Sequence, residues 1–407
     1  MDKVEEKAKQ DHRDIGRELD LFSFHEIAPG APFWHPKGMV IFKELEKIAR
    51  EINDADGFQE ISTPILVKKE HFEQSGHWQH YRENMFYFAN PRDEKEVLVI
   101  KPMNCPESTY VYNSQTRSYR DLPLRLSEIG RLHRNELSGT LGGLFRVRQI
   151  TMDDAHIYCL PEQTETEVIK IIKTVTDFYA LFGFETTYVL ATRPEKYQGK
   201  PADWNFAEKV LHEALSKAKV KYSTAEGEGA FYGPKIEMHL KDSQNRDWQL
   251  GTAQIDIAML PASFDVKYTD DQGERKKPAV IHRAIFGSFE RFIGVLLEHT
   301  NGNLPVWLSP VQVAVLPISD KQNGWAEEVL EELKRTHIRV ELNNSNETLG
   351  KKIRESEMQK ISYLLIVGEK EKEAKAVAVR QRGHGDIGQM GVDKFIEKIK
   401  KEITNKI

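Results

Sequence analysis

Apolar positions follow two different spacings in the first part of the chain. From Met39 they recur every three or four residues as far as Gly57, which predicts a helix of about four turns. Beyond Gly57 they alternate with polar residues in short segments separated by long loops, a pattern typical of antiparallel strands. The segments predicted as strands are residues 58–66, 85–88, 97–101, 124–132, 144–158 and 248–260.

Helical spacing returns in two longer segments. Residues 161–219 are predicted to be mainly helical, and residues 284–299 are predicted to form one helix. Near Asn301 the pattern changes, because short β-branched strands alternate with amphipathic helices, which indicates an α/β unit with a largely parallel sheet. We therefore predict three parts: a charged N-terminal helix or linker over 1–20, a larger domain over 21–302 and a smaller domain over 303–407.

The composition of the 407 residues excludes several classes of protein. Lys and Arg number 58 and Asp and Glu 63, so the formal net charge of −5 excludes a polycation. No apolar run approaches the roughly 20 residues that span a bilayer, and the first residues are too charged for a secretory signal. Two cysteines are too few for a disulfide framework. We expect a protein of the cytoplasm or an organelle matrix that does not enter a membrane.

A glycine-rich loop carries the first candidate chemistry. Residues 131–148 place arginines and acidic residues at both ends of a loop between two predicted strands. Such a loop can fold over a polyanion, because a guanidinium group binds two phosphate oxygens at once. A solvated hairpin with surface ion pairs explains the same residues equally well. For Arg291, on the helix predicted over 284–299, the alternative to phosphate binding is an ordinary snorkelling side chain.

Potential metal ligands are scattered along the chain. In the strand predicted over 144–158, Met152, Asp154 and His156 share one face, since successive side chains alternate. Together with Cys105 and His282, His156 would complete the thiolate and two imidazoles of an open catalytic zinc site. The spacing makes no metal motif, and a hydrogen-bonded core histidine is the more common explanation of each imidazole.

These segments together resemble the threonyl-tRNA synthetases, a family of class II aminoacyl-tRNA synthetases, from residue 15 to residue 405. Residues 57–64, 131–148 and 287–292 resemble the three class motifs, the first of which forms a dimer interface. The resemblance implies an α+β class II catalytic domain, with an antiparallel sheet flanked by helices, followed by a smaller α/β anticodon-binding domain. The segments particular to the threonine enzymes are KPMNCP at 101–106, DDAH at 153–156, AFYGPKIE at 230–237 and IHRA at 281–284.

For the amino acid, the resemblance implies a Zn²⁺ ion on Cys105, His156 and His282, completed by the amino and hydroxyl groups of threonine. A site that demands the hydroxyl would reject valine, which an apolar pocket distinguishes by only about 1–3 kcal/mol. The residues implied to contact threonine are Asp154, Tyr232, Met152 and Arg134.

For ATP, the resemblance implies that Glu136 reads the adenine edge and that Arg146 and Arg291 hold the γ-phosphate, with Mg²⁺ bridging the phosphates. His77 resembles a histidine of the transfer step, where a group titrating near neutrality would act as base or orienter; a loop histidine that caps a turn is the alternative. The residues implied to bind ATP are Arg134, Glu136, Arg146, Gln254 and Arg291, and those implied in catalysis are Arg134, Arg291, His77 and Lys235.

The implied activity is a threonine–tRNA ligase that forms threonyl-adenylate and transfers threonine to the 3′ end of tRNA(Thr), acting as a homodimer. Four residues of the C-terminal domain are implied to hydrogen-bond anticodon bases, although without the resemblance each would be a solvated surface residue. They are Asn346, Arg354, Glu371 and Arg380.

Three features depart from the family. The two N-terminal domains of the usual member are absent and the sequence has no HxxxH motif, so we expect a short form that does not edit seryl-tRNA in cis. Met152 stands where many members have glutamine, and Glu107 and Ser108 follow Cys-Pro where Gly-His is common. These differences leave open a paralogue that binds tRNA without catalysis or that activates another amino acid.

Overall fold

The computed structural model describes residues 10–406. Contacts group residues 24–32 and 46–295 into one compact unit, which we call the sheet unit. Residues 10–23, 33–45 and 296–406 form a second, which we call the C-terminal unit. The first nine residues of the predicted N-terminal helix lie outside the described part, within which α1 covers His12–Glu18. The domain boundaries expected at residues 20 and 302 stay a prediction.

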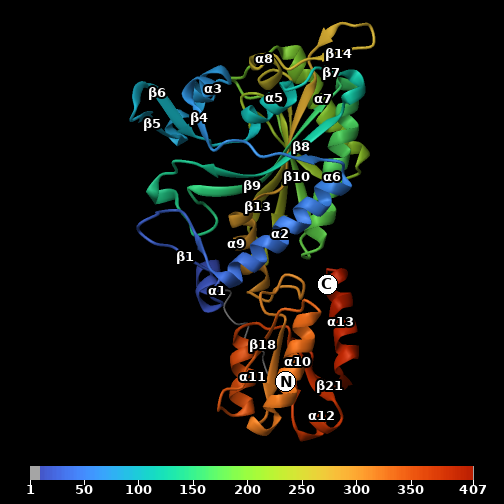
Figure 1. Cartoon of the computed structure of the whole chain (residues 1–407). Coiled ribbons are helices and arrows are strands. Elements are labelled where there is room, and N and C mark those ends of the chain that lie inside the picture. Colours follow the sequence, from blue (N-terminus) through green and yellow to red (C-terminus); the bar gives the residue numbers. More distant parts are fainter. Residues whose placement is uncertain (1–9, 407) are drawn as a thin grey trace. The chain divides into compact units, whose positions relative to one another are not determined.

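The sheet unit is built on an eight-stranded sheet (Figure 1). Across the sheet the strands are β11 (Tyr222–Ala225), β10 (Thr186–Ala191), β12 (Lys235–Lys241), β13 (Asp247–Asp256), β16 (Ala279–Ser288), β9 (Gln149–Cys159), β8 (Leu124–His133) and β3 (Gln59–Glu60). Neighbours from β10 to β8 are antiparallel, whereas β11 and β3 pair in parallel at the edges. The predicted antiparallel sheet is confirmed.

Two long helices cover one face of this sheet, whereas the other face carries both polar residues and a buried apolar cluster. α6 (Thr164–Ala180) and α7 (Pro201–Lys217) lie side by side along the strands (Figure 1), and each buries an apolar stripe. On β12 the alternate residues Ile236, Met238 and Leu240 are fully buried, while the residues between them are partly exposed. This alternation is typical of a sheet with one covered face.

Smaller elements border the other face. The further helices here are α3 (Lys69–Gln74), α4 (His77–Tyr81), α5 (Cys105–Asn113) and α8 (Leu260–Ser263). One three-stranded sheet has the order β4 (Leu66–Lys68), β6 (Asp93–Ile100) and β5 (Phe86–Asn90), and a second has the order β15 (Arg275–Lys276), β14 (Tyr268–Thr269) and β7 (Arg117–Ser118). The predicted helix of residues 39–57 is observed as α2 (Pro36–Ala55).

Two of the sequence-based assignments were wrong. Residues 284–288, predicted as helix, continue β16, and α9 (Phe289–Thr300) begins only after them. A strand in the middle of a sheet is buried on both faces, so its unbroken apolar run resembles a buried helix. Residues 144–148, predicted as strand, belong to the loop before β9. The segment 161–219 is mainly helical as predicted, with the short strand β10 between α6 and α7.

The C-terminal unit contains a five-stranded sheet ordered β18 (Val340–Leu342), β17 (Val313–Pro317), β19 (Tyr363–Val367), β20 (Ala376–Gln381) and β21 (Gly385–Gly391). The first three strands are parallel, but β20 and β21 pair antiparallel, so the sheet is mixed rather than largely parallel. The unit also holds β1 (Phe22–Ser23), β2 (Phe33–Trp34) and the helices α10 (Asn323–Arg335), α11 (Leu349–Met358), α12 (Glu369–Glu373) and α13 (Val392–Thr404).

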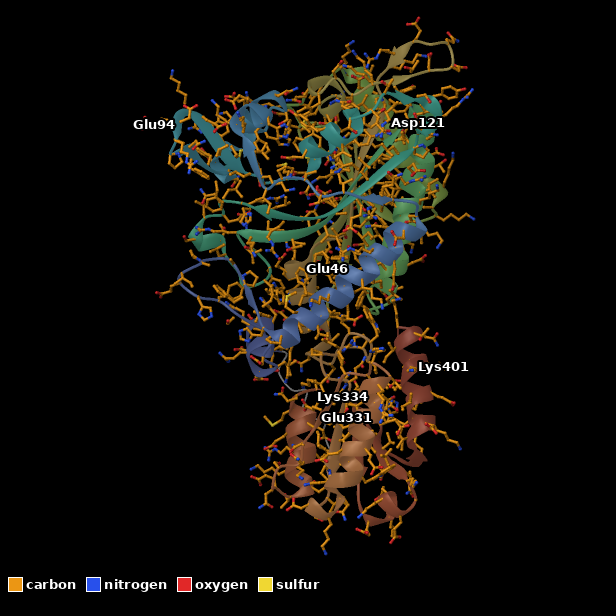
Figure 2. The ribbon with its side chains drawn as sticks, viewed as in Figure 1. Glu46, Glu94, Asp121, Glu331, Lys334 and Lys401 are labelled. Carbon is orange, nitrogen blue, oxygen red and sulfur yellow. The ribbon has the colours of Figure 1, made fainter. Side chains whose placement is uncertain are left out.

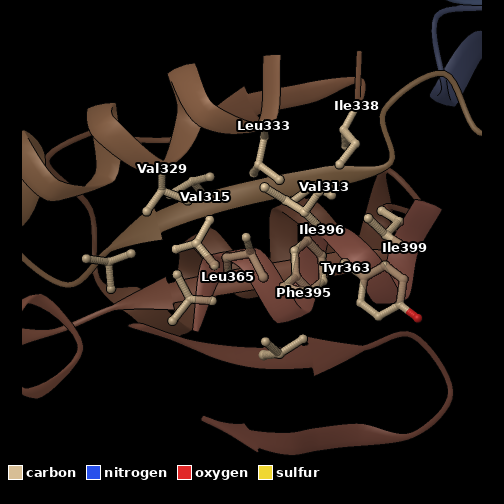
Figure 3. Close-up of a cluster of buried hydrophobic side chains, with 14 of the residues drawn as sticks. Val313, Val315, Val329, Leu333, Ile338, Tyr363, Leu365, Phe395, Ile396 and Ile399 are labelled. Carbon is tan, nitrogen blue, oxygen red and sulfur yellow. The ribbon is translucent and has the colours of Figure 1, made fainter. Parts of the chain in front are cut away.

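An apolar cluster between this sheet and its helices forms the core of the unit. Val315, Val329 and Phe395 are fully buried in it (Figure 3). On the opposite side of α10, Glu331 and Lys334 form an exposed ion pair (Figure 2). Among residues 10–406, no helix is both long enough and apolar enough to cross a bilayer.

Candidate functional site

Strand register aligns four of the predicted site residues in one row across the sheet. Lys235 on β12 lies opposite Gln254 on β13. Gln254 lies opposite His282 on β16, and His282 lies opposite His156 on β9. Directly paired residues point to the same face of a sheet, so side chains that are distant in sequence meet on one surface.

The three predicted metal ligands converge at the end of this row. One ligand atom from each of Cys105, His156 and His282 lies within 4.8 Å of the other two. The imidazole rings stand nearly perpendicular, at 82°, with their centroids 5.0 Å apart. Cys105 is the first residue of α5, and all three side chains are buried.

The chemistry of these three side chains fits a metal ion. The Nε2 atoms of His156 and His282 are buried without a hydrogen-bond partner among the described residues, a state that costs about 1–3 kcal/mol per group. Burial holds the pKa of His156 well below its ordinary value, which keeps the imidazole neutral and able to bind a metal. Burial also raises the pKa of the Cys105 thiol, so metal binding would have to displace its proton.

Side chains implied to bind threonine lie around these ligands. Asp154 accepts a hydrogen bond from Nδ2 of Asn104 at 3.2 Å, and burial raises the pKa of its carboxyl. The Tyr232 ring lies 5.4 Å from the His282 ring, centroid to centroid. Asn104 can approach because Gly130 faces it: a Cβ there would lie 2.3 Å from Oδ1 of Asn104.

A cavity of about 240 Å³ opens on the same unit and is lined by the predicted phosphate-binding arginines. Arg134 and Arg146 come from the loop between β8 and β9, and Arg291 comes from the first turn of α9. Glu136 and Met152 also line the cavity. The structure therefore brings together four of the five residues predicted to bind ATP.

Contacts among these residues concentrate positive charge in the cavity. Glu136 accepts from both Nε and Nη2 of Arg146 at 2.8 Å, so the hairpin is closed by one ion pair. Arg291 donates from Nε to the carbonyl of Phe145 at 2.9 Å. Burial, together with the charges of Arg134 and Arg146, lowers the pKa of Arg291. Three guanidinium groups with one carboxylate between them leave a net positive site for a polyanion.

Two residues implied in the ATP and catalytic sets do not line this cavity. Gln254 donates from Nε2 to the carbonyl of Gly233 at 3.0 Å and is nearly buried. Lys235 is partly exposed, and its ammonium group lies 2.6 Å from a carboxylate oxygen of Glu237. Lys235 and Gln254 pair with each other two residues along the strands from the pair of Glu237 and Thr252, and Thr252 does line the cavity.

His77 is placed differently from the sequence-based expectation. It begins α4, is fully buried and has its Nδ1 atom 2.8 Å from the hydroxyl of Ser75. Its Nε2 atom is buried without a hydrogen-bond partner among the described residues. Burial lowers the pKa of this imidazole to about 3, so the ring is neutral and does not titrate near neutrality.

The predicted anticodon-reading residues lie on the C-terminal unit. Asn346 and Arg354 are exposed, on the loop before α11 and on α11 itself. Arg380 on β20 approaches Glu357 of α11 at 3.8 Å. Glu371 accepts from the backbone N–H of Gly368 at the start of α12. The contact between Arg380 and Glu357 therefore joins β20 to α11, the helix that carries Arg354.

Sequence reasoning missed several residues of the site. Gln249 and Thr252 of β13 line the cavity, and Asn104 holds Asp154. The alternation along β13 was available from the sequence, but which face looks into a cavity depends on strand pairing. No local pattern reports that pairing.

Two family models match the chain. The model described as tRNA synthetase class II core domain (G, H, P, S and T) matches residues 86–300. The model described as anticodon binding domain matches residues 312–402.

Known proteins are similar over the whole chain. A threonine–tRNA ligase from Carboxydothermus hydrogenoformans is 52% identical over 403 residues, 99% of this chain and 63% of the relative. One from Clostridium botulinum strain Langeland is 52% identical over 406 residues. The chain spans about 63% of the length of these curated relatives. A crystal structure of the RNA binding domain of threonyl-tRNA synthetase from Cryptosporidium parvum is 40% identical, with a TM-score of 0.91 over 97% of this chain and 98% of that one.

Proposed function

Because the chain belongs to the class II aminoacyl-tRNA synthetases, we propose that it is a threonine–tRNA ligase, which activates L-threonine with ATP and esterifies tRNA(Thr). One observation carries the proposal. Three potential metal ligands lie within 4.8 Å of one another, in the same unit as an arginine-lined cavity. A metal-binding amino-acid pocket beside a polyanion site is what selection and activation of a hydroxy amino acid require.

We assign Cys105, His156 and His282 as the residues that would hold zinc. A bound zinc ion would act as a Lewis acid toward the amino and hydroxyl groups of threonine. Asp154, fixed by Asn104, would accept a hydrogen bond from one of those groups, and Tyr232 would contact the amino group. Valine, which lacks the hydroxyl, would leave these polar groups unsatisfied and be rejected.

For ATP, we assign Glu136 to the adenine edge and Arg146 and Arg291 to the γ-phosphate. The Glu136–Arg146 ion pair closes the hairpin, so ATP binding would separate the two partners and give each a new one. Arg134 would bridge the threonine carboxylate and the α-phosphate, Gln254 and Lys235 would line the site, and Mg²⁺ would accompany the phosphates. The arginines would offset charge that builds up as pyrophosphate leaves.

The chemistry would proceed in two steps. A carboxylate oxygen of threonine attacks the α-phosphorus in line, and pyrophosphate leaves. The ribose 3′-hydroxyl of the terminal adenosine then attacks the carbonyl of the adenylate, and AMP leaves. His77 is neutral and anchored by Ser75, so we assign it an orienting role in this transfer rather than that of a strong base.

The remaining partners follow from the family. We propose that Asn346, Arg354, Glu371 and Arg380 bind anticodon bases of tRNA(Thr), whose unpaired edges offer hydrogen bonds. We also propose a homodimer formed through residues 57–64 and a location in the cytoplasm.

The experiment is amino-acid-dependent exchange of pyrophosphate into ATP, measured with threonine, serine and valine, with and without a zinc chelator. We expect threonine-dependent exchange that the chelator abolishes and no exchange with valine. Serine keeps the hydroxyl and lacks one methyl group, so its rate should fall by about 10- to 150-fold. Exchange with none of the three, or valine exchange equal to that of threonine, would contradict the proposal.

A further inference from the structure

Four ionisable side chains form a network along the exposed face of β12 and onto β13. We call Lys235, Glu237, His239 and Asp247 the β12 network. Lys235, Glu237 and His239 alternate on that face, and each contacts the next. The Lys235 ammonium lies 2.6 Å from Oε1 of Glu237, and Oε2 of Glu237 lies 3.1 Å from Nε2 of His239. The Nδ1 atom of His239 lies 2.7 Å from a carboxylate oxygen of Asp247 on β13.

The β12 network lies beside the wall of the arginine-lined cavity. Glu237 pairs with Thr252, and His239 pairs with Gln249 after a register shift between Met238 and His239. Thr252 and Gln249 both line the arginine cavity. Lys235 pairs with Gln254, in the row that leads to the metal ligands. The β12 network therefore begins at the row of the amino-acid site and passes the nucleotide cavity. It ends at Asp247, whose side chain is 52% exposed.

The bonding pattern gives each member a single orientation. Each carboxylate oxygen of Glu237 has its own partner, one being Lys235 and the other His239. The lysine stem is flexible, and fixing it in one conformer opposes up to about 2 kcal/mol of side-chain entropy. A carboxylate that is itself held in place restricts the ammonium group before substrate arrives.

We propose that Glu237 is a positioning residue, which fixes the Lys235 ammonium for the activation step and is itself oriented by His239 and Asp247. This inference rests on the proposed function, in which Lys235 lines the site of adenylate formation. Glu237 touches no reacting atom and acts only through Lys235.

Protonation of His239 makes the hydrogen bonds of the β12 network depend on pH. On its own strand, His239 is faced by Glu237 and Lys235. On the neighbouring strands it is faced by Asp247 and Gln249 of β13 and by Thr187 of β10. Helix α7 packs against the opposite face of β12. Hydrogen bonding to Glu237 and to Asp247 raises the pKa of His239. Only the protonated ring can donate to both carboxylates at once, so one of them loses its donor when His239 loses its proton.

The first test is Glu237→Gln, with kcat and KM for pyrophosphate exchange measured at saturating threonine. We expect kcat to fall about tenfold or more, because Lys235 loses its fixed orientation, while KM for ATP stays within about threefold. A damaged fold would instead lower the amount of active protein or the midpoint of thermal unfolding. A kcat within twofold of that of the unaltered chain would overturn the proposal.

The second test is Asp247→Asn at the exposed end of the β12 network. This substitution should leave the fold intact, because the Asp247 side chain is 52% exposed. Removing one of the two carboxylates lowers the pKa of His239, so the basic limb of the kcat–pH profile should move to lower pH, by up to about one unit. Asp271→Asn is the matched control: it removes another exposed carboxylate of the same unit, outside the β12 network, and should leave the profile unchanged. A profile that does not move in Asp247→Asn would overturn the proposal.

Failure of the inference differs from failure of the proposed function. If the unaltered chain shows no threonine-dependent exchange, the proposed function is wrong. If it exchanges normally and the two variants match it in kcat, KM and pH profile, only the role of Glu237 is wrong.

Discussion

Among single residues, two imidazole nitrogens give the strongest support for a metal site. The Nε2 atoms of His156 and His282 are buried and unpartnered among the described residues, and the nearest carboxylate to His282, that of Asp256, is 3.5 Å away and already accepts from three backbone N–H groups. Buried polar atoms are almost always satisfied. A ligand that binds both atoms would remove the cost of leaving them unsatisfied.

The metal assignment predicts a difference between the two cysteines. Cys105→Ala should reduce the zinc content of the purified protein from one ion per chain to near zero, because two imidazoles alone hold zinc weakly. Cys159→Ala is the matched control, since Cys159 is also buried but lies beside Thr164 and outside the ligand cluster. Stoichiometric zinc in Cys105→Ala, measured by atomic emission, would contradict the assignment.

Glu290 predicts a pH dependence of stability. Its carboxyl is buried in the first turn of α9, where both oxygens accept from the backbone N–H of Thr151, and burial raises its pKa to about 7. A carboxyl with a raised pKa binds its proton more tightly in the folded state, so its ionisation destabilises the fold as the pH rises from the unfolded-state value near 4.5 through 7. The contribution of Glu290 to the stability of the sheet unit should therefore be less favourable at pH 8 than at pH 5.

The test compares Glu290→Gln with the unaltered chain in urea unfolding at pH 5 and pH 8. The glutamine stays neutral, so the variant should gain roughly 2–3 kcal/mol relative to the unaltered chain between the two pH values. The exposed Glu94 (Figure 2) supplies the control, because Glu94→Gln should show no such gain. An equal pH response in Glu290→Gln and the unaltered chain would be inconsistent with a buried, titrating carboxyl.

At the scale of elements, sequence patterns succeeded where one face of an element is apolar. α2 was predicted from helical spacing, and the shared face of Met152, Asp154 and His156 follows from the alternation of β9. They failed at β16, which is buried along almost its whole length and so has no polar face to reveal its period. The turn from β16 into α9 was missed for the same reason.

That turn depends on Gly287, which has a φ of +72°. A Cβ there would lie 2.8 Å from the backbone carbonyl of Leu250. Gly287→Ala should therefore cost roughly 1–3 kcal/mol of unfolding free energy. It should also raise KM for ATP, because Arg291 lies four residues later and is held by Ser288 and Phe145.

A second glycine provides the comparison for this measurement. Gly324→Ala in α10 places its Cβ in open space within a helix, so stability should be unchanged or slightly higher. If Gly287→Ala were as stable and as active as the unaltered chain, the strained turn would not be what positions Arg291.

In the whole molecule, the residues proposed for amino-acid activation and those proposed for anticodon binding lie in different units. The arginine cavity and the metal ligands lie in the sheet unit, and the proposed anticodon residues lie in the C-terminal unit. The ligand set could be named from the sequence only through the family resemblance, because its members come from α5, β9 and β16 and share no spacing. Their convergence depends on strand pairing over more than a hundred residues, which periodicity does not encode.

This division predicts that one variant can separate the two reactions. Arg354 is exposed on α11, so Arg354→Ala should leave stability and pyrophosphate exchange unchanged. It should raise KM for tRNA(Thr) in aminoacylation by about tenfold or more, which corresponds to the loss of a contact worth about 1–3 kcal/mol. Lys401→Ala on α13 (Figure 2) is an exposed control that should alter neither reaction. A parallel loss of exchange in Arg354→Ala would argue against separate roles.

Ligase activity itself is measured by attachment of labelled amino acid to tRNA(Thr) in the presence of ATP and zinc. We expect an alkali-labile ester with threonine, weaker charging with serine and none with valine, and no charging by Cys105→Ala. Failure to charge tRNA(Thr) with threonine, or equal charging with valine, would contradict the proposed function.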